Sequence, residues 1–326
     1  MAITLKNAKV GMADKVDQQV VDMFRKNSLL LDQMPFDNVI APGTGGSTLT
    51  YGYIQFKTPA TAAVRTLNKD YVHAEAKREK KTTSAVIMGG SFQVDRVLQN
   101  SDCAADELAF QAEQKIQATA NYFHNLVING ASDDLSEGFV NNTFDGLKKL
   151  LTGTENEIKS TVPLTTSQEL DKNYNAFLDE MDSFLSTVDG TPSMLLMNRE
   201  MLVKLRSIAR RAGYYDRTKD DFGRVVETYA GIPMVDMGTY YNGASNKDVV
   251  ETDAQGKTCI YAVCLGLDGF HGISPQGTGV ITSYLPDLTA PGAVKTGDVE
   301  LVAGVALKST RKAAVLQNIA VKTVGP

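Results

Sequence analysis

Few residues in this 326-residue sequence combine the type and the spacing that catalysis or phosphate binding requires. The segment GTGGST, Gly43–Thr48, has the glycine content of a phosphate-binding loop. Such a loop ends in Gly-Lys-Ser or Gly-Lys-Thr and leads into a helix, whereas this segment lacks the lysine and precedes a β-type run. We therefore expect a flexible linker at this position.

The segment GISPQG, Gly272–Gly277, is superficially similar to the turn that carries the nucleophilic serine of a hydrolase. Its spacing differs from that motif, and Pro275 directly follows Ser274. Because proline has no N–H, this turn would lack the donor that normally stabilises the oxyanion. We expect an ordinary turn here, with Ser274 as one of its residues.

Metal and thiol chemistry are not indicated either. The three histidines are scattered, and no two have the spacing of metal ligands. They are His73, His124 and His271. The cysteines, Cys103, Cys259 and Cys264, are the odd and sparse set of a protein in a reducing compartment. Cys259 and Cys264 are an odd number of positions apart, so on a strand they would lie on opposite faces and could not share one metal ion. The sequence therefore predicts no catalytic, cofactor-binding or metal-binding residue. We expect a protein that is not an enzyme.

One charged segment has a possible binding role. EAKREKK, Glu75–Lys81, contains four basic residues close together: Lys77, Arg78, Lys80 and Lys81. A run of charges is usually a solvated surface. The alternative is that these residues contact an acidic neighbour, and the sequence leaves both interpretations open.

Composition limits the partners of the chain. Hydrophobic residues make up 43% and charged residues 22%, as in ordinary globular proteins. The 33 basic and 38 acidic residues give a formal net charge of −5, which argues against nucleic-acid binding by bulk attraction. A run of roughly 20 apolar residues is needed to span a bilayer, and the sequence contains none. We therefore expect no membrane partner. The length suggests about two domains.

The elements that would position these residues can be read from hydrophobic spacing. Apolar residues recur at helical intervals in five segments, and Thr166–Glu169 has the residues of a capping box. The expected helices are 14–31, 102–129, 144–151, one that begins after Thr166, and one that runs from Arg199 to a stop at Gly213.

Two β-rich arms, Ser47–Leu67 and Thr82–Leu98, flank the polar segment Asn68–Lys81. We expect a long hairpin with a charged tip, which would need a partner to pack against. Further strands are expected at Thr228–Met237, Cys259–Leu265, Val280–Tyr284 and Val299–Val321, the last with a break near Lys308. Helices and mainly antiparallel strands without βαβ alternation indicate the α+β class.

The order of these segments resembles a major capsid protein of tailed bacteriophages, of the HK97 fold. The resemblance begins at about Ser47 with the long β-loop. It continues through VDRVLQNSDCAADELAFQAEQKIQATANYFHNLVING, NNTFDGLKKLL, PSMLLMNREMLVKLRSIARRAG, TYAGIPMVDMG, YAVCLGLDGFHGI and ELVAGVALKSTRKAAVLQNIAVKT. In such a protein TYAGIPMVDMG would be a packing strand without chemistry, in which Gly231 and Pro233 set a tight bend.

The resemblance implies an HK97-like division of the chain. It consists of an N-terminal arm with an amphipathic helix (1–46), an extended β-loop or E-loop (47–100), a peripheral P-domain with a long spine helix (101–191), an axial A-domain (192–298), and C-terminal strands that return to the P- and A-domains (299–326). The four basic residues would lie at the E-loop tip and contact a neighbouring subunit: Lys77, Arg78, Lys80 and Lys81.

The resemblance also implies a function. The chain would form a homo-oligomer of pentamers and hexamers, which build an icosahedral shell around double-stranded DNA without sequence-specific binding. It would be found in the virion after assembly in the bacterial host cytoplasm, with a separate scaffolding protein and a portal as partners. The helical pattern of residues 14–31 also resembles encapsulins, shells of the same fold that enclose cargo protein, although the long β-loop favours the phage interpretation. A hydrolase with an unrecognised site is the third hypothesis.

Overall fold

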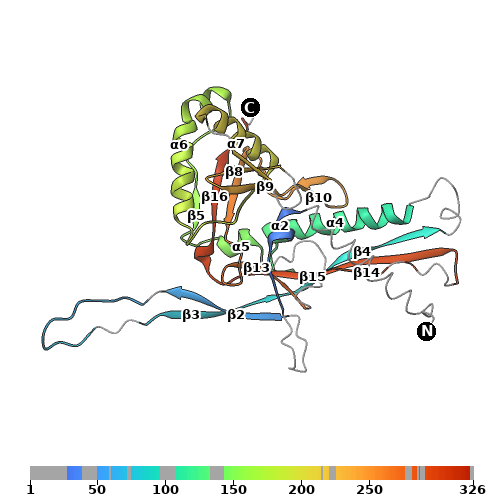
Figure 1. Ribbon diagram of the computed structural model, residues 1–326, viewed down its shortest axis with the longest axis horizontal. Coiled ribbons are helices and arrows are strands. Elements are labelled where there is room, and N and C mark those ends of the chain that lie inside the picture. The colour runs from blue at the N-terminus through green and yellow to red at the C-terminus, as the bar shows by residue number, and fades with distance from the viewer. Residues whose placement is uncertain are drawn as a thin grey trace, which may run out of the picture.

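The computed structural model describes residues 28–38, 50–58, 60–71, 75–95, 107–132, 143–213, 216–219, 225–275, 281–284, 286 and 291–323. These residues form an upper part around a seven-stranded sheet, an elongated part along helix α4 (Glu107–Asn129), and a two-stranded arm that projects from the base (Figure 1). Some positions discussed above lie outside the described residues: 14–27, Gly43–Thr48, His73 and Cys103.

The upper part is a mixed sheet whose one face is covered by α6 (Ser167–Ser186) and α7 (Arg199–Ala212). In spatial order its strands are β5 (Glu157–Lys159), β16 (Ala313–Ala320), β12 (Lys257–Val263), β6 (Met194–Met197), β9 (Ile232–Asp236), β8 (Val225–Tyr229) and β7 (Asp216–Lys219). The helices place Phe177, Met181 and Ile208 in the core against this face.

The central strands of this sheet serve two cores. In β12, Ile260 and Ala262 pack in the core formed with α6 and α7, whereas Tyr261 and Val263 pack in the core that contains α4. Successive side chains of a strand point to opposite faces, so the sheet is buried on both sides. One sheet therefore joins the upper and the elongated parts of the molecule.

The ends of the two covering helices confirm the signals in the sequence. Thr166 and Glu169 form a complete capping box at the start of α6. Asn198 caps α7 by accepting a hydrogen bond from the Met201 N–H. Gly213 ends α7 in the left-handed region, with φ 77°, a conformation that glycine adopts without a steric penalty.

The elongated part packs α4 on a five-stranded sheet (Figure 1). The strands run in the order β1 (Phe36–Asn38), β13 (Phe270–Ser274), β15 (Val294–Leu307) and β14 (Ile281–Tyr284), and β4 (Val86–Asp95) also pairs with β15. Ile116, Phe123 and Val127 of α4 share a core with Phe92 and Leu301 of the sheet. The break expected near Lys308 is confirmed, but β15 begins at Val294, before the predicted start at Val299.

The remaining described elements include the two strands of the arm. They are α2 (Leu29–Gln33), β2 (Thr50–Thr58), β3 (Lys77–Ser84), α5 (Leu147–Leu151), β10 (Thr239–Tyr241), β11 (Asn246–Asp248) and η2 (Thr310–Lys312). No helix in the described part of the chain is long and apolar enough to cross a membrane.

The prediction of a single strand over Thr228–Met237 is wrong. The segment forms two antiparallel strands, β8 and β9, in which Tyr229 pairs with Ile232. Between them, Ala230 and Gly231 have φ values of 50° and 79°. Two successive residues with positive φ make the tight turn that matches the twist of a hairpin. The chain therefore reverses at this point and does not merely bend.

The prediction of one continuous helix over 14–31 is also wrong at Ser28. This residue has an extended backbone, with φ −142° and ψ 115°, and its hydroxyl accepts a hydrogen bond from the Leu31 N–H. A short helix, α2, therefore begins at Leu29. The polar side chain that caps a helix start lies inside the apolar spacing, so the spacing alone hid the interruption.

Candidate interaction site

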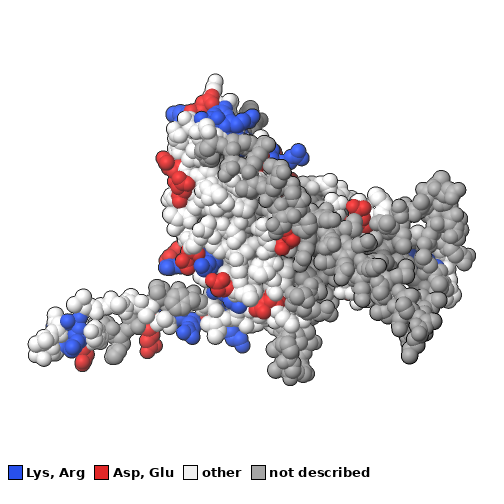
Figure 2. Space-filling model, viewed as in Figure 1, with Lys and Arg blue, Asp and Glu red and all other residues white. Residues whose placement is uncertain are grey.

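The arm is an antiparallel pair of strands, β2 and β3, which among the described strands pair only with each other. The pairing runs from Thr50 and Ser84 at the base, and its register shifts between Phe56 and Thr58. Figures 1 and 2 show that the arm extends away from the upper part as a free-standing projection. Isolated two-stranded sheets are only marginally stable, so we expect the arm to pack against a partner.

All four basic residues that were picked out from the sequence lie in β3, opposite β2. The expectation that Asn68–Lys81 connects the two strands is therefore wrong for its last five residues. The reason is that β2 imposes an extended partner on a polar segment whose own propensity does not indicate a strand. The part of the connection that the structure describes, residues 60–71 and 75–76, is exposed throughout.

Strand alternation divides the basic residues between the two faces of the arm. Lys80 pairs with Ile54, which is 63% exposed, and Arg78 pairs with Phe56. Lys81 pairs instead with Tyr53, which is 6% exposed and faces the body. Since alternate residues of a strand share a face, Arg78 and Lys80 lie on the outward face.

The body-facing side carries Lys77, Glu79 and Lys81 in alternate positions. The Lys81 Nζ lies 3.8 Å from a Glu79 carboxylate oxygen. This face therefore has an internal partner for at least part of its positive charge. The outward face has two cations beside an exposed apolar side chain, a combination that suits contact with a protein surface bearing carboxylates.

The base of the arm is held to the body by side chains. The Gln55 amide donates to the Leu307 carbonyl at 3.1 Å, and the Thr83 hydroxyl donates to the Val305 carbonyl at 3.0 Å. Tyr53 also packs into a small apolar cluster with Ala85, Ile273 and Ala306. The body thus fixes the root of the arm and leaves its distal half free.

The two histidines that the structure describes, His124 and His271, are buried. The His124 Nε2 lies 2.6 Å from the Ser28 hydroxyl, and burial lowers the pKa of His124 to about 4. His271 is fully buried in β13, and burial lowers its pKa as well. Both rings are therefore neutral at physiological pH. Within the described residues, no group of three or more His, Cys, Asp or Glu side chains could hold a metal ion.

Ser274 and the cysteines are also placed by packing. Ser274 is the last residue of β13 and is fully buried, so the prediction of an ordinary turn residue is wrong.

Cys259 packs against the core that contains α4, and Cys264 packs against the core of α6 and α7. The predicted placement of the two cysteines on opposite faces is confirmed. Burial raises the pKa of both thiols, which keeps them in the unreactive protonated form.

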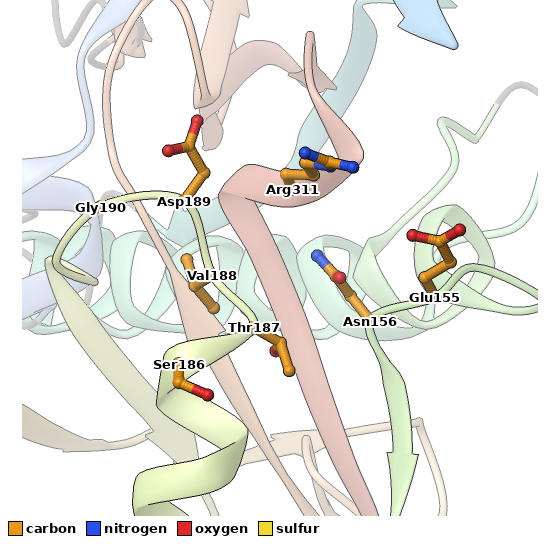
Figure 3. Close-up of a pocket in the computed structure, with 8 residues that line it drawn as sticks. All are labelled: Glu155, Asn156, Ser186, Thr187, Val188, Asp189, Gly190 and Arg311. Atoms are coloured by element: carbon orange, nitrogen blue, oxygen red, sulfur yellow. The ribbon is translucent and has the colours of Figure 1, made fainter. Parts of the chain in front are cut away.

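A polar hollow of about 480 Å³ lies where the upper part meets the segment before β16. Figure 3 shows that its lining comes from the loop before β5, from the chain after α6, and from Arg311 of η2. The backbone there is already paired, since the Asp189 N–H donates to the Arg311 carbonyl and the Asn156 amide donates to Thr310 and Ala313. These groups hold loops together and do not form a catalytic constellation.

Comparisons of the whole chain with known proteins find likeness in three-dimensional structure. No family model matches the sequence, and no curated protein does. The holo-SrpI encapsulin complex of Synechococcus elongatus matches with a TM-score of 0.55 and 18% identity, over 91% of this chain and 89% of that one.

Two further matches come from a phage and from a GTA particle. A structure from Mycobacterium phage Bobi has a TM-score of 0.55 and 15% identity, over 89% of each chain. The capsid of a native GTA particle has a TM-score of 0.54 and 11% identity, over 89% of this chain and 90% of that one. At such identities the likeness concerns the fold, and it extends over nearly the whole chain.

Proposed function

We propose that this chain, which has the α+β HK97 fold of capsid and encapsulin subunits, assembles with copies of itself into a closed protein shell, and that it is the major capsid protein of a tailed bacteriophage. Its pentamers and hexamers would enclose double-stranded DNA without reading its sequence. The shell would form in the host cytoplasm with a separate scaffolding protein and a portal. The role is structural and requires no catalytic residue.

In this proposal the β2–β3 arm is the E-loop and α4 is the spine helix of the P-domain. The seven-stranded sheet belongs to the axial A-domain, and the division of the chain at residues 46, 100, 191 and 298 remains a prediction. α6 shares its core with α7 and the strands of the seven-stranded sheet.

The projecting arm is the observation that carries the proposal. Its exposed apolar side chains include Ile54 (63% exposed), Val64 (100%), Leu67 (89%) and Tyr71 (61%). An arm of two strands gains little from its own packing, and apolar surface left in water favours association. A neighbouring subunit would cover this surface, and in a shell every subunit supplies both an arm and a surface to receive one.

We also propose that the outward-facing Arg78 and Lys80 contact carboxylates of that neighbour. Both are exposed; Lys80 lies opposite Ile54, and Arg78 is the next residue of β3 on the same face. Lys77 and Lys81 were expected to share this role, but they lie on the other face, beside Glu79. The outward pair is therefore the stronger candidate for inter-subunit contact.

An encapsulin-type shell that encloses cargo protein is the second candidate. The likeness to the holo-SrpI encapsulin complex, which covers 91% of this chain, favours it. The two candidates share the assembled form and differ in the contents of the shell. A net charge of −5 is compatible with both, because neither role requires strong binding of the contents by the subunit as a whole.

The test is to express the full-length chain and examine it by sedimentation and electron microscopy. Shells, tubes or isolated capsomers are expected, and a stable monomer at high protein concentration would contradict the proposal. Particles from the natural source are then analysed for nucleic acid and for other proteins. Packaged double-stranded DNA supports the phage capsid, and an enclosed protein without DNA supports the encapsulin.

A further inference from the structure

Three segments that are far apart in the sequence meet at the base of the arm. The Tyr51 hydroxyl of β2 donates to the Asp37 Oδ2 of β1 at 2.6 Å. The Lys308 Nζ, one residue after β15, lies 3.8 Å from the same oxygen and 5.7 Å from the centre of the Tyr51 ring. The three side chains form one polar cluster that links the N-terminal strand, the arm and the long strand of the body.

The direction of the arm depends on side-chain contacts, which are those of this cluster together with the contacts of Gln55 and Thr83 that hold the root of the arm. Neither β2 nor β3 pairs with a body strand among the described residues, so no backbone ladder fixes the angle between arm and body. A single residue, Ala85, separates β3 from β4, which does belong to the body sheet. Such a junction can bend, because loop or terminal residues absorb changes in φ and ψ at a hinge.

The charges in the cluster favour its formation at neutral pH. Burial alone would raise the pKa of Asp37, but hydrogen bonds from Tyr51 and the Asn38 N–H, with the charge of Lys308, lower it overall. Burial and the Asp37 carboxylate raise the pKa of Tyr51, so its hydroxyl remains a donor. Two other ionisable groups of the described residues face Tyr51: Tyr53, whose ring stacks on it at 6.1 Å, and His271, whose ring meets it edge-on at 5.9 Å. The charge of Asp268 acts in turn on His271.

The position of Asp37 depends in turn on a short strand. β1 has three residues, and it pairs in parallel with β13 through Phe36 and Gly272, Asp37 and Ile273, and Asn38 and Ser274. The Phe36 ring lies directly over Gly272, where an added Cβ would be only 2.4 Å from a ring carbon. Glycine at this position is therefore what allows β1 to take its place on β13.

We propose that Asp37, Tyr51 and Lys308 form a latch that couples the position of the N-terminal strand β1 to the direction of the β2–β3 arm. While β1 is paired with β13, the latch holds the arm in one direction, and displacement of β1 releases it. The inference goes beyond the proposed shell function, since it concerns how one subunit sets its own arm. It also supplies a route by which a partner that binds the N-terminal segment could redirect the arm.

The experiment measures the distance between the arm and the body in the full-length chain, kept below its assembly concentration. Genetically encoded spin labels replace Lys69 in the loop of the arm and Lys172 on α6, which leaves the native cysteines untouched. Pulsed electron spin resonance of the otherwise native chain is expected to give one narrow distance distribution.

Two variants reach the latch by different routes. Tyr51→Phe removes only the hydroxyl that binds Asp37, and Gly272→Ala displaces Phe36 without altering any latch residue. Each is expected to replace the narrow distribution with a broad one, and the double variant should be no broader than the single variants, because both act on one element. Phe36→Ala, which removes the ring that lies over Gly272, is a further variant for the case that Gly272→Ala does not fold.

Tyr229→Phe is the matched control. It removes a tyrosine hydroxyl that donates to Asp182 at 2.7 Å, in the upper part and away from the arm, and it should retain the narrow distribution. The latch is refuted if Tyr51→Phe keeps the native distribution. The coupling to β1 is refuted if folded Gly272→Ala, or Phe36→Ala in its place, keeps it while Tyr51→Phe does not.

Discussion

Reversing the two outward charges of the arm should impair assembly far more than reversing the two on its other face. The first variant is Arg78→Glu with Lys80→Glu, and the second is Lys77→Glu with Lys81→Glu. An exposed ion pair contributes about 0.2–1 kcal/mol, so losing two pairs costs about 0.4–2 kcal/mol for each arm. This corresponds to a roughly twofold to thirtyfold weaker contact, and the loss recurs at every equivalent interface of a shell.

The assay is the yield of sedimentable particles across a salt series, at equal protein concentration. The outward-face variant should show its largest loss at low salt. The difference in particle yield from the native chain should become smaller as salt increases. At 1 M the Debye length falls to roughly 3 Å, so the new repulsion is screened. The second variant serves as the control with the same change in net charge. Its yield should remain much closer to that of the native chain, since Lys77 and Lys81 lie on the face opposite to the proposed contact.

Two results would refute this reasoning. Native yield of the outward-face variant at every salt concentration would mean that Arg78 and Lys80 are merely solvated. Equal losses in the two variants would mean that assembly responds to net charge and not to the face of the strand. Circular dichroism of both variants should first show native secondary structure.

Four further predictions concern the body and the loop of the arm. Replacing residues 60–76 by a short turn should retain a cooperative thermal transition but abolish shells in sedimentation, and normal shells would show that the loop is dispensable. Gly231→Val should lower the free energy of unfolding by about 1–3 kcal/mol, because a β-branched residue is strained at φ 79°. Ser274→Ala should leave it unchanged or slightly higher in the same denaturant titration, because the Ser274 hydroxyl is buried without a partner among the described residues. The folded-state pKa of His124, about 4, lies below its ordinary value of 6.5, so its contribution to stability is fully present above pH 6.5 and is lost as pH falls toward 4. A His124→Gln variant should show a weaker dependence of melting temperature on pH over this window, and an unchanged slope would contradict the assignment.

Local signals predicted the helix ends well, because each depends on one or two neighbouring residues. The capping box at Thr166, the cap at Asn198 and the glycine stop at Gly213 all have their expected geometry. The resemblance to HK97-type capsid proteins predicted the fold. That prediction depended on the sequence of many segments along the chain, because no single segment identifies the fold by itself.

The failures have a common physical origin in contacts between distant segments. The strand character of Lys77–Lys81 comes from pairing with β2, and the reversal at Ala230 depends on an alanine in a conformation that its side chain does not favour. The latch could not be found from spacing either, because Asp37, Tyr51 and Lys308 come together only in the folded chain. No short-range pattern marks any of the three.

The position of the basic residues on β3 also matters before any partner is present. A strand that pairs on one side only exposes backbone N–H and C=O groups, and such an edge can template uncontrolled pairing with another chain. Lysines and arginines along an edge strand oppose this process. Pairing of two such strands would bring like charges together and would bury charged groups, and both cost free energy. Lys77, Arg78, Lys80 and Lys81 all belong to such a strand in the described part of the arm. The same side chains would therefore keep newly made subunits from aggregating through their arms, so that neutral substitutions there should lower soluble yield even where shells can still form.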